Sequence, residues 1–191
     1  MKQKILLLLG HPQSDSFCAA LATAYAQAAR DRGAEVRELR LAALQFNPVL
    51  LVGFRGEQPL EPDLVAAQAS IQWAEHLVFV YPTWWGSMPA LLKGFIDRVF
   101  LPGFAFRYRK DSSFWDKLLQ GRSADVIITL DTPPFIYRWL MGAPGVKQMR
   151  AGVLEFCGVK PVRVSTLGPI RGSKPAQREA WLRKIARLAV S

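Results

Sequence analysis

Two neighbouring tryptophans mark the most unusual stretch of this sequence. The segment Pro82–Met88 (PTWWGSM) follows an apolar run and precedes a helical pattern. Flat indoles such as those of Trp84 and Trp85 pack well on a planar aromatic ligand, and Thr83 and Gly86 add backbone amides that a ligand can approach closely. Burial of both indoles in a core or a subunit interface explains the same residues equally well. The residues alone therefore predict either a platform for a planar ring or a packed aromatic cluster.

A second stretch, Gly10–Phe17 (GHPQSDSF), has the composition of an anion-binding turn. Ser14, Asp15 and Ser16 all favour a helix N-cap, and the amides and dipole at a helix start attract anions. The stretch is neither a Walker loop nor G-x-G-x-x-G, so hydroxyls and amides would have to hold any phosphate. An ordinary capped turn is the alternative, and His11 taken alone indicates only a polar loop residue.

A third stretch, Leu130–Trp139 (LDTPPFIYRW), combines turn formers with aromatic side chains. Asp131 and Thr132 favour a turn, and Pro133 and Pro134 stiffen the chain that follows. Three aromatic residues and an arginine come next. The stretch predicts a further ligand-facing loop, with a rigid connector carrying surface aromatics as the alternative.

The elements that must position these loops alternate along the chain. Apolar runs predict strands at Lys4–Leu9, Glu35–Leu39, His76–Tyr81, Asp125–Leu130 and Val162–Thr166. Helical periodicity and end signals predict helices at Ser16–Arg32, Asp63–Trp73, Pro89–Phe100, Val146–Phe156 and Lys174–Leu188. Residues 41–60 contain prolines and glycines and predict irregular structure.

Strands that are apolar throughout indicate a parallel sheet covered by helices on both faces. We therefore expect one three-layer α/β/α domain over residues 1–191, with a five-stranded parallel sheet. In such sheets, ligands bind beyond the carboxyl ends of the strands, where the strand order reverses. The three loops above follow the first, third and fourth strands, which places them together at that edge.

Composition excludes several classes of protein. Half of the 191 residues are apolar, enough for a full core, and Cys18 and Cys157 form no disulfide or metal-binding pattern. No cluster of His, Cys and carboxylates indicates a metal site. The apolar run at residues 5–9 is too short for a signal peptide, and no run reaches the ~20 residues that span a bilayer. These features predict a cytoplasmic protein.

The charge of the chain is uneven. The formal net charge is +10; residues 1–100 hold nine basic and nine acidic residues, whereas residues 101–191 hold sixteen and six. A basic half favours phosphate-bearing partners: nucleotides, nucleic acid or an anionic membrane. Because the basic residues are scattered and form no block, an ordinary solvated surface accounts for most of them.

Together these pieces resemble the flavodoxin-like NAD(P)H:quinone oxidoreductases, a family that includes drug-activity modulators and ancillary flavoproteins of potassium-efflux systems. The resemblance is most specific over Tyr81–Tyr108, where a proline-led loop with tryptophan precedes PALLKG, RVF and an aromatic-rich FAF segment. Gly10–Phe17 and Leu154–Lys160 (LEFCGVK) match further family segments. The resemblance covers most of the chain and implies a flavodoxin-like fold.

The resemblance also implies a flavin cofactor, FAD or FMN, and NAD(P)H as co-substrate. The residues expected around the flavin phosphate and ribityl chain are His11, Ser16, Phe17 and Cys18. Those expected along the ring are Pro82, Thr83, Trp84, Trp85 and Gly86, with Asp131 and Thr132 at its other edge. Phe106 and Tyr108 match aromatics that cover the substrate pocket, usually from the partner subunit of a homodimer. Tyr137 and Tyr108 are the expected catalytic residues, with Tyr137 stabilising the reduced flavin.

The chain departs from the family pattern in two places. Pro133 and Pro134 stand where the family often has a Gly-Gly pair that contacts the flavin, and prolines donate no amide hydrogen bonds. No histidine follows His76, so a loop histidine of the family is missing. Proton supply would then come from solvent or Tyr137.

The predicted function is hydride transfer from NAD(P)H through the flavin to a quinone-like acceptor. A non-catalytic flavoprotein that regulates a membrane transporter is the main alternative, and it leaves a peripheral membrane or transporter association open. A flavodoxin-type electron carrier is disfavoured because such carriers are usually acidic. A nucleic-acid binder has only the net charge in its favour. The residues do not separate FMN from FAD or identify the acceptor, and the basic half gives NADPH only a weak preference over NADH.

Overall fold

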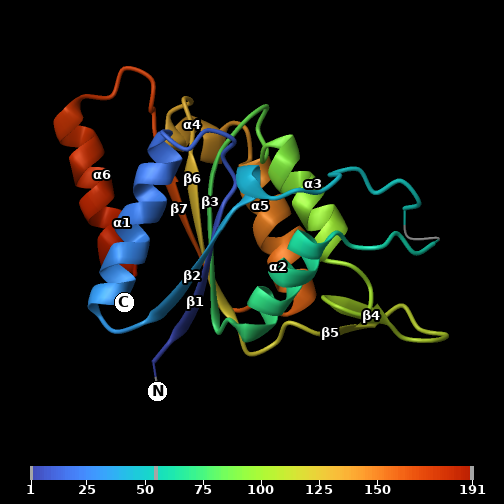
Figure 1. Ribbon diagram of the computed structural model, residues 1–191. Helices are drawn as coiled ribbons and strands as arrows, with labels where there is room; N and C mark the ends of the chain where they lie inside the picture. The colour runs from blue at the N-terminus through green and yellow to red at the C-terminus, as the bar shows by residue number, and fades with distance from the viewer. Residues whose placement is uncertain (1, 54–55, 190–191) are drawn as a thin grey trace.

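The computed structural model describes residues 2–53 and 56–189, and its centre is a five-stranded parallel sheet (Figure 1). The strands are β1 (Lys4–Leu9), β2 (Glu35–Arg40), β3 (His76–Pro82), β6 (Ser123–Thr129) and β7 (Val162–Leu167). Their order across the sheet is β2-β1-β3-β6-β7. All four pairings between neighbours are parallel. The predicted fold class is confirmed, and all five predicted strands are present with ends shifted by no more than two residues.

Strand burial follows position in the sheet. Every residue of β3, at the centre, is buried, and so are five of the six residues of β1. Strand β2 lies at an edge, and its sequence EVRELR keeps only Val36 and Leu39 half-buried. A strand that is covered by helices on both faces is apolar along its whole length, without alternation of apolar and polar residues.

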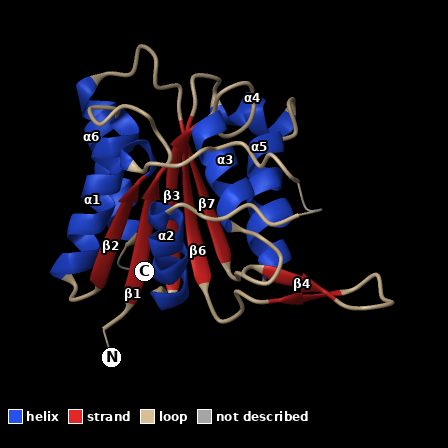
Figure 2. Cartoon of the chain, turned by 45° about the vertical axis from the view of Figure 1, so that its right-hand side comes forward, coloured by secondary structure: helices blue, strands red, loops and turns tan. Residues whose placement is uncertain are grey.

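Two helical layers enclose the sheet (Figures 1 and 2). Helices α1 (Phe17–Asp31) and α6 (Pro175–Leu188) pack together on one face. The other face carries α2 (Pro62–Trp73), α3 (Ala90–Val99), α5 (Pro144–Lys147) and the π-helical segment η2 (Gln148–Glu155). Each layer has its own apolar core against the sheet, so the carboxyl-end loops are held from both sides.

Helices α1, α2, α3 and α6 begin and end within one residue of the predicted bounds, and the following differences matter most. Pro89 is the N-cap of α3 rather than a first-turn residue. The segment after β6 is not a connector but a short helix, α4 (Pro134–Trp139), because Pro134 at the first position presets the backbone and needs no amide partner. The helix expected at Val146–Phe156 begins earlier, at Pro144, and continues as the π-helical η2. Periodicity at 100° per residue cannot anticipate that change of pitch.

A small hairpin was not predicted. Strands β4 (Phe106–Tyr108) and β5 (Trp115–Lys117) pair antiparallel and extend from the body of the molecule (Figure 1). Each strand has three residues, too few for an alternating pattern to stand out in the sequence. The indole of Trp115 stacks on Phe156 at 4.4 Å and donates to its carbonyl oxygen at 2.9 Å. These contacts attach the hairpin to Phe156, the residue that follows η2.

The segment expected to be irregular, residues 41–60, contains only the 3₁₀ turn η1 (Leu41–Ala43) among its described residues; residues 54–55 lie outside them. Arg98, fully buried on α3, holds this segment in place. Its guanidinium donates to the carbonyl oxygens of Asn47 and Pro59 and forms a two-pronged ion pair with Glu61, at 2.9 and 3.2 Å. A buried arginine with this many partners is a tether between distant parts of the chain.

Across residues 2–53 and 56–189, no helix combines the length and the apolar character needed to cross a membrane. The same residues hold no group of three or more His, Cys, Asp or Glu side chains suited to a metal ion.

Candidate active site

The crevice predicted at the carboxyl end of the sheet exists. Strand β1 lies between β2 and β3. The chain continues from β1 to β2 on one side, whereas β3 and the later strands lie on the other side, so the loops after β1 and β3 diverge. Hydrogen bonds join the loop starts: Gly10 N to Val80 O at 2.9 Å and Thr83 N to Thr129 O at 2.7 Å. A cavity of about 550 Å³ opens there. That volume is within the range of small-molecule and cofactor sites.

Most of the predicted site residues meet in this cavity. Those that line it are His11, Phe17, Cys18, Pro82, Thr83, Trp84, Trp85, Gly86, Asp131, Thr132 and Tyr137. Thr129, Leu130, Met141 and Ile170 also line it and were not predicted. The sequence could have indicated Thr129 and Leu130, because they lie at the end of a predicted strand at the ligand edge. No feature of the sequence marks Met141 or Ile170 as ligand-facing. Ser16, Phe106 and Tyr108 do not line the cavity.

The two tryptophans belong to a tight turn, with Trp84 at its first position and Trp85 at its tip. Trp84 N donates to Ser87 O at 2.9 Å and Ser87 N returns a bond to Trp84 O at 3.0 Å. Trp85 (φ 52°) and Gly86 (φ 78°) both have positive φ, the signature of a type I′ turn. For Trp85 this left-handed conformation costs about 1–2 kcal/mol. Its side chain is fully exposed, at 104%. A strained residue that contributes no packing to its own fold points to a role in binding.

Tyr137 braces this turn from α4. The side chain is 1% exposed; its hydroxyl donates to Gly86 O at 3.0 Å and accepts from Gly145 N at 3.0 Å. Gly145 N also bonds Gly86 O directly, at 2.9 Å. Burial raises the pKa of the Tyr137 phenol, outweighing the opposite effect of the Gly145 amide. Because its proton is already committed to Gly86, the geometry gives Tyr137 a positioning role, and the catalytic role predicted for it is untested.

The start of α1 faces the cavity. Ser16 is its N-cap, as its residue type predicted: Oγ accepts from Ala19 N at 3.2 Å and donates to Gln13 O at 2.9 Å. The Ser16 hydroxyl is therefore used within the turn. Phe17 and Cys18, the first helical residues, line the cavity instead. Helix-start amides and the positive end of the α1 dipole are thus aimed at the ligand space.

Burial keeps two titratable groups of the cavity neutral. It lowers the pKa of His11, despite the opposing effects of the Gln13 amide and Asp15. His11 Nδ1 accepts from Gln13 N at 3.0 Å, so Nε2 carries the proton of the neutral ring. Burial also raises the pKa of Cys18 to about 11, and its thiol contacts Thr129 Oγ1 at 3.2 Å. The site therefore offers no thiolate nucleophile and no imidazolium at neutral pH.

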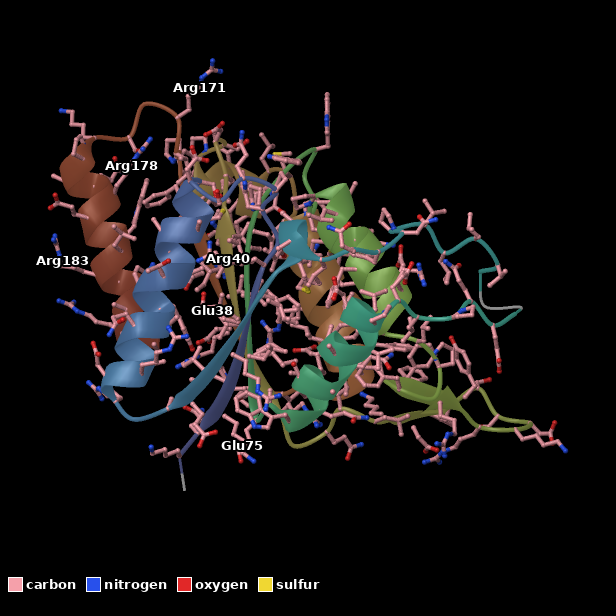
Figure 3. All side chains as sticks on the ribbon, viewed as in Figure 1. Glu38, Arg40, Glu75, Arg171, Arg178 and Arg183 are labelled. Atoms are coloured by element: carbon pink, nitrogen blue, oxygen red, sulfur yellow. The ribbon has the colours of Figure 1, made fainter. Side chains whose placement is uncertain are left out.

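Positive charge lies beside the helix start. Arg178 on α6 sits over the ring of Phe17 at 5.6 Å and donates to Ser173 Oγ at 2.8 Å. Figure 3 shows it near the upper end of α6, below Arg171 in the loop after β7. Part of the basic excess of the second half of the chain thus lies beside the start of α1, next to the lining residue Phe17.

The edge after β6 is built differently from the predicted loop. Pro133 is the N-cap of α4 and Pro134 is its first residue. The backbone N–H groups at a helix start have no partner within the helix, so two prolines there cost α4 no hydrogen bond. Asp131 accepts from Arg171 N at 2.8 Å and thereby ties this edge to the loop after β7. Thr132 remains at the cavity wall.

The two β4 aromatics predicted to cover the substrate pocket differ in exposure, and Phe106 is the buried one. Its side chain is 7% exposed, packed edge-on against Phe156 at 5.1 Å and Tyr108 at 5.2 Å. The ring of Phe106 therefore contributes to the core of its own subunit. Tyr108 is 62% exposed.

The family model of proteins with a flavodoxin-like fold, Flavodoxin_2, matches residues 3–189. The chain belongs to the Flavodoxin_2 family. The resemblance inferred from the loop sequences is thereby confirmed, and the strand order β2-β1-β3-β6-β7 is the one that this fold requires.

The chain is also similar to two solved structures and to one further named protein. The Smu.1420 protein of Streptococcus mutans UA159 is 31% identical with a TM-score of 0.84, over 98% of each chain. The NAD(P)H:quinone oxidoreductase of Methanothermobacter marburgensis is 25% identical with a TM-score of 0.83, over 99% of this chain and 96% of that one. NAD(P)H dehydrogenase [quinone] 1 of Rattus norvegicus is 27% identical over 96% of this chain and 76% of its own length.

Proposed function

We propose that this protein is a flavin-dependent NAD(P)H oxidoreductase that reduces a quinone-like acceptor. The observation that carries the proposal is the cavity of about 550 Å³ at the β1/β3 switch point, framed by the strained Trp85–Gly86 turn and by the start of α1. Relatives named NAD(P)H:quinone oxidoreductase and NAD(P)H dehydrogenase [quinone] support the substrate class.

The residues present suit a flavin nucleotide, FMN or FAD. The α1 start and the nearby Arg178 suit a phosphate, and the indoles of Trp84 and Trp85 suit a planar tricyclic ring. Gly86, with φ 78°, lets the backbone approach such a ring without a Cβ in the way. When bound, the flavin supplies the hydride-accepting and hydride-donating chemistry, which no side chain of this cavity can supply.

The protein's own groups orient the ligands and exclude water. The hydroxyl of Tyr137 donates to Gly86 O and so fixes the position of the Trp84–Ser87 turn. Neutral His11 lies edge-on to Trp84, with 5.9 Å between the ring centroids. The Tyr137 hydroxyl already donates its proton to Gly86 O, so we propose that protons for the acceptor come from solvent.

A second copy of the chain is proposed to complete the pocket. Trp85 lines the cavity, and Trp139 and Leu140 end α4 just before the lining residue Met141; the three are 104%, 80% and 83% exposed, which suits a subunit contact. The exposed Tyr108 on the β4–β5 hairpin is the group that such a partner would contribute. We further propose that residues 1–191 act as one domain and that the protein is cytoplasmic; two free buried cysteines suit a reducing compartment.

Releasing the bound flavin and measuring turnover tests the proposal. Purified protein should be yellow, release FMN or FAD on heating, and oxidise NADH or NADPH only when a quinone is supplied. The relative rates with NADH and NADPH show which nicotinamide the protein prefers, and the released flavin shows whether it binds FMN or FAD. Protein that takes up neither flavin would refute the proposal; flavin-loaded protein without turnover would instead favour a regulatory flavoprotein.

A further inference from the structure

A second polar cavity lies at the opposite, amino-terminal end of the sheet. It has a volume of about 350 Å³, and its wall includes Ser123, His76, Tyr25 and Arg163. Figure 3 shows the two ends of the molecule: Arg171 marks the flavin edge, and Glu75, the residue before His76, lies at the other. Nothing in the proposed oxidoreductase chemistry uses these side chains.

A buried carboxylate organises this cavity. Asp125, 1% exposed, accepts at Oδ1 from Arg163 Nε at 2.7 Å and at Oδ2 from Arg163 Nη2 at 2.8 Å. Tyr25 Oη donates to Oδ2 at 2.8 Å, and His76 Nε2 lies 3.2 Å from the same oxygen. Burial would raise the pKa of Asp125, but the bonds from His76 and Arg163 outweigh it and hold the pKa at about 2. The carboxylate is therefore ionised and can only accept hydrogen bonds.

The proton positions follow from this network. Tyr25 has one hydroxyl proton, and it points to Asp125. His76 Nε2 faces two acceptors, the Asp125 carboxylate and Tyr25 Oη at 3.1 Å, so Nε2 must carry a proton. In the neutral ring Nδ1 is then bare, and Ser123 Oγ lies 2.7 Å from it. Ser123 is consequently the donor in that bond, and its proton points at a base held in one tautomer by a buried carboxylate.

We propose that Ser123, His76 and Asp125 form a second, hydrolytic site that cleaves small carboxylic esters. The order of groups is that of an activated serine: a half-buried hydroxyl on a cavity wall, a histidine that accepts its proton, and a carboxylate that fixes the histidine. In serine proteases Nε2 accepts the serine proton and Nδ1 faces the carboxylate. Here Nδ1 faces Ser123 and Nε2 faces Asp125, and the same two roles are filled. Ser123 and His76 are the catalytic residues, and Asp125 and Tyr25 position them.

The reaction balances without any cofactor. Ser123 Oγ forms a bond to the ester carbonyl carbon while its proton moves to His76 Nδ1, and the carbonyl oxygen becomes an oxyanion. Collapse breaks the bond to the alkoxy oxygen, and the alcohol leaves with the proton from His76. Water then attacks the acylated serine, gives a proton to His76 and releases the acid as the proton returns to Ser123 Oγ.

We assign the stabilisation of the oxyanion to a polar side chain of the same cavity wall. Gln3 and Arg32 line the same wall as Ser123. An amide or guanidinium near a developing negative charge is the usual stabilising element of acyl transfer. At about 350 Å³ the space suits a short acyl group rather than a long chain.

Labelling with diisopropyl fluorophosphate and hydrolysis of p-nitrophenyl acetate test the site on the flavin-loaded protein. We expect diisopropyl fluorophosphate to modify Ser123, located by peptide mass spectrometry, and to stop ester hydrolysis without affecting quinone reduction. Ser123→Ala should abolish both labelling and hydrolysis. Ser165→Ala, a half-buried serine of β7 that does not line this cavity, is the matched control and should retain them.

The histidine and carboxylate need readouts beyond loss of rate. His76→Gln should slow labelling by about 100-fold or more. Asp125→Asn should change the pH dependence of labelling, because the ring is no longer held in one tautomer, whereas quinone reduction should report an intact fold. Labelling elsewhere than Ser123, equal labelling in Ser123→Ala, or no labelling and no hydrolysis in the folded wild-type protein would overturn the proposal.

Discussion

Replacing Trp85 by asparagine should make the protein more stable and its flavin weaker-bound at once. Trp85 holds φ 52° at the first central position of a type I′ turn, and Gly86 follows it. Asparagine followed by glycine is the pair that this turn prefers, because asparagine tolerates the left-handed conformation. The indole is fully exposed, so its removal costs the fold no burial.

The two effects have opposite signs and can be sized. Relief of left-handed strain, about 1–2 kcal/mol, is offset in part by asparagine's own residual cost, leaving a gain of about 1 kcal/mol. For a chain of this size that is a rise in Tm of about 2–4 °C. Loss of one aromatic contact with the flavin ring costs about 1 kcal/mol, a roughly fivefold weaker flavin affinity.

Thermal unfolding of the flavin-free protein and flavin titration by fluorescence measure the two effects separately. Trp85→Ala is the control, since it removes the same indole without supplying a residue that tolerates positive φ; its flavin affinity should fall equally while Tm does not rise. If Trp85→Asn unfolds at a lower temperature than wild type, the indole stabilises the fold or a subunit contact, and the reasoning from strain fails. An unchanged flavin affinity would remove Trp85 from the flavin site.

Three further predictions follow from buried polar groups. Arg98→Met should destabilise the protein by about 2–5 kcal/mol in urea unfolding, because the carbonyl oxygens of Asn47 and Pro59 lose their donor and Glu61 loses its ion pair. Tyr137→Phe should cost about 1 kcal/mol of stability but keep kcat within tenfold, since Gly86 O retains its bond from Gly145; a fall of 100-fold or more would identify the hydroxyl as the proton donor. The stability that ionised Asp125 contributes should be present above about pH 4 and disappear as pH falls toward 2, and Asp125→Asn should lack that acid transition.

Some features of the site could be read directly from residue types. Ser16 caps α1 because a hydroxyl at that position pairs with an orphan amide of the first turn, whatever surrounds it. Local chemistry of this kind depends on neighbours along the chain, so it is visible in the sequence.

Other features depend on contacts that sequence spacing does not reveal. Tyr137 and Gly86 are 51 residues apart, and only the packing of α4 against the Trp turn shows that the hydroxyl is already bonded. Phe106 and Tyr108 look equivalent in the sequence, but their rings face the core and the solvent respectively. Phe106 and Tyr108 are two positions apart in β4 and therefore lie on the same face of the strand. They differ only in what packs against them, and a strand of three residues is too short to show a pattern.

The amino-acid sequence determined the order of strands and helices, the parallel sheet and the three loops at its ligand edge, because apolar runs, helical periods and turn residues act over a few neighbours. Tertiary structure alone decided which hydroxyls are committed, which tryptophan bears strain, and that Ser123, His76 and Asp125 meet at the far end of the sheet. Those residues come from two strands separated by more than forty positions, and only the pairing of β3 with β6 brings them into hydrogen-bond distance.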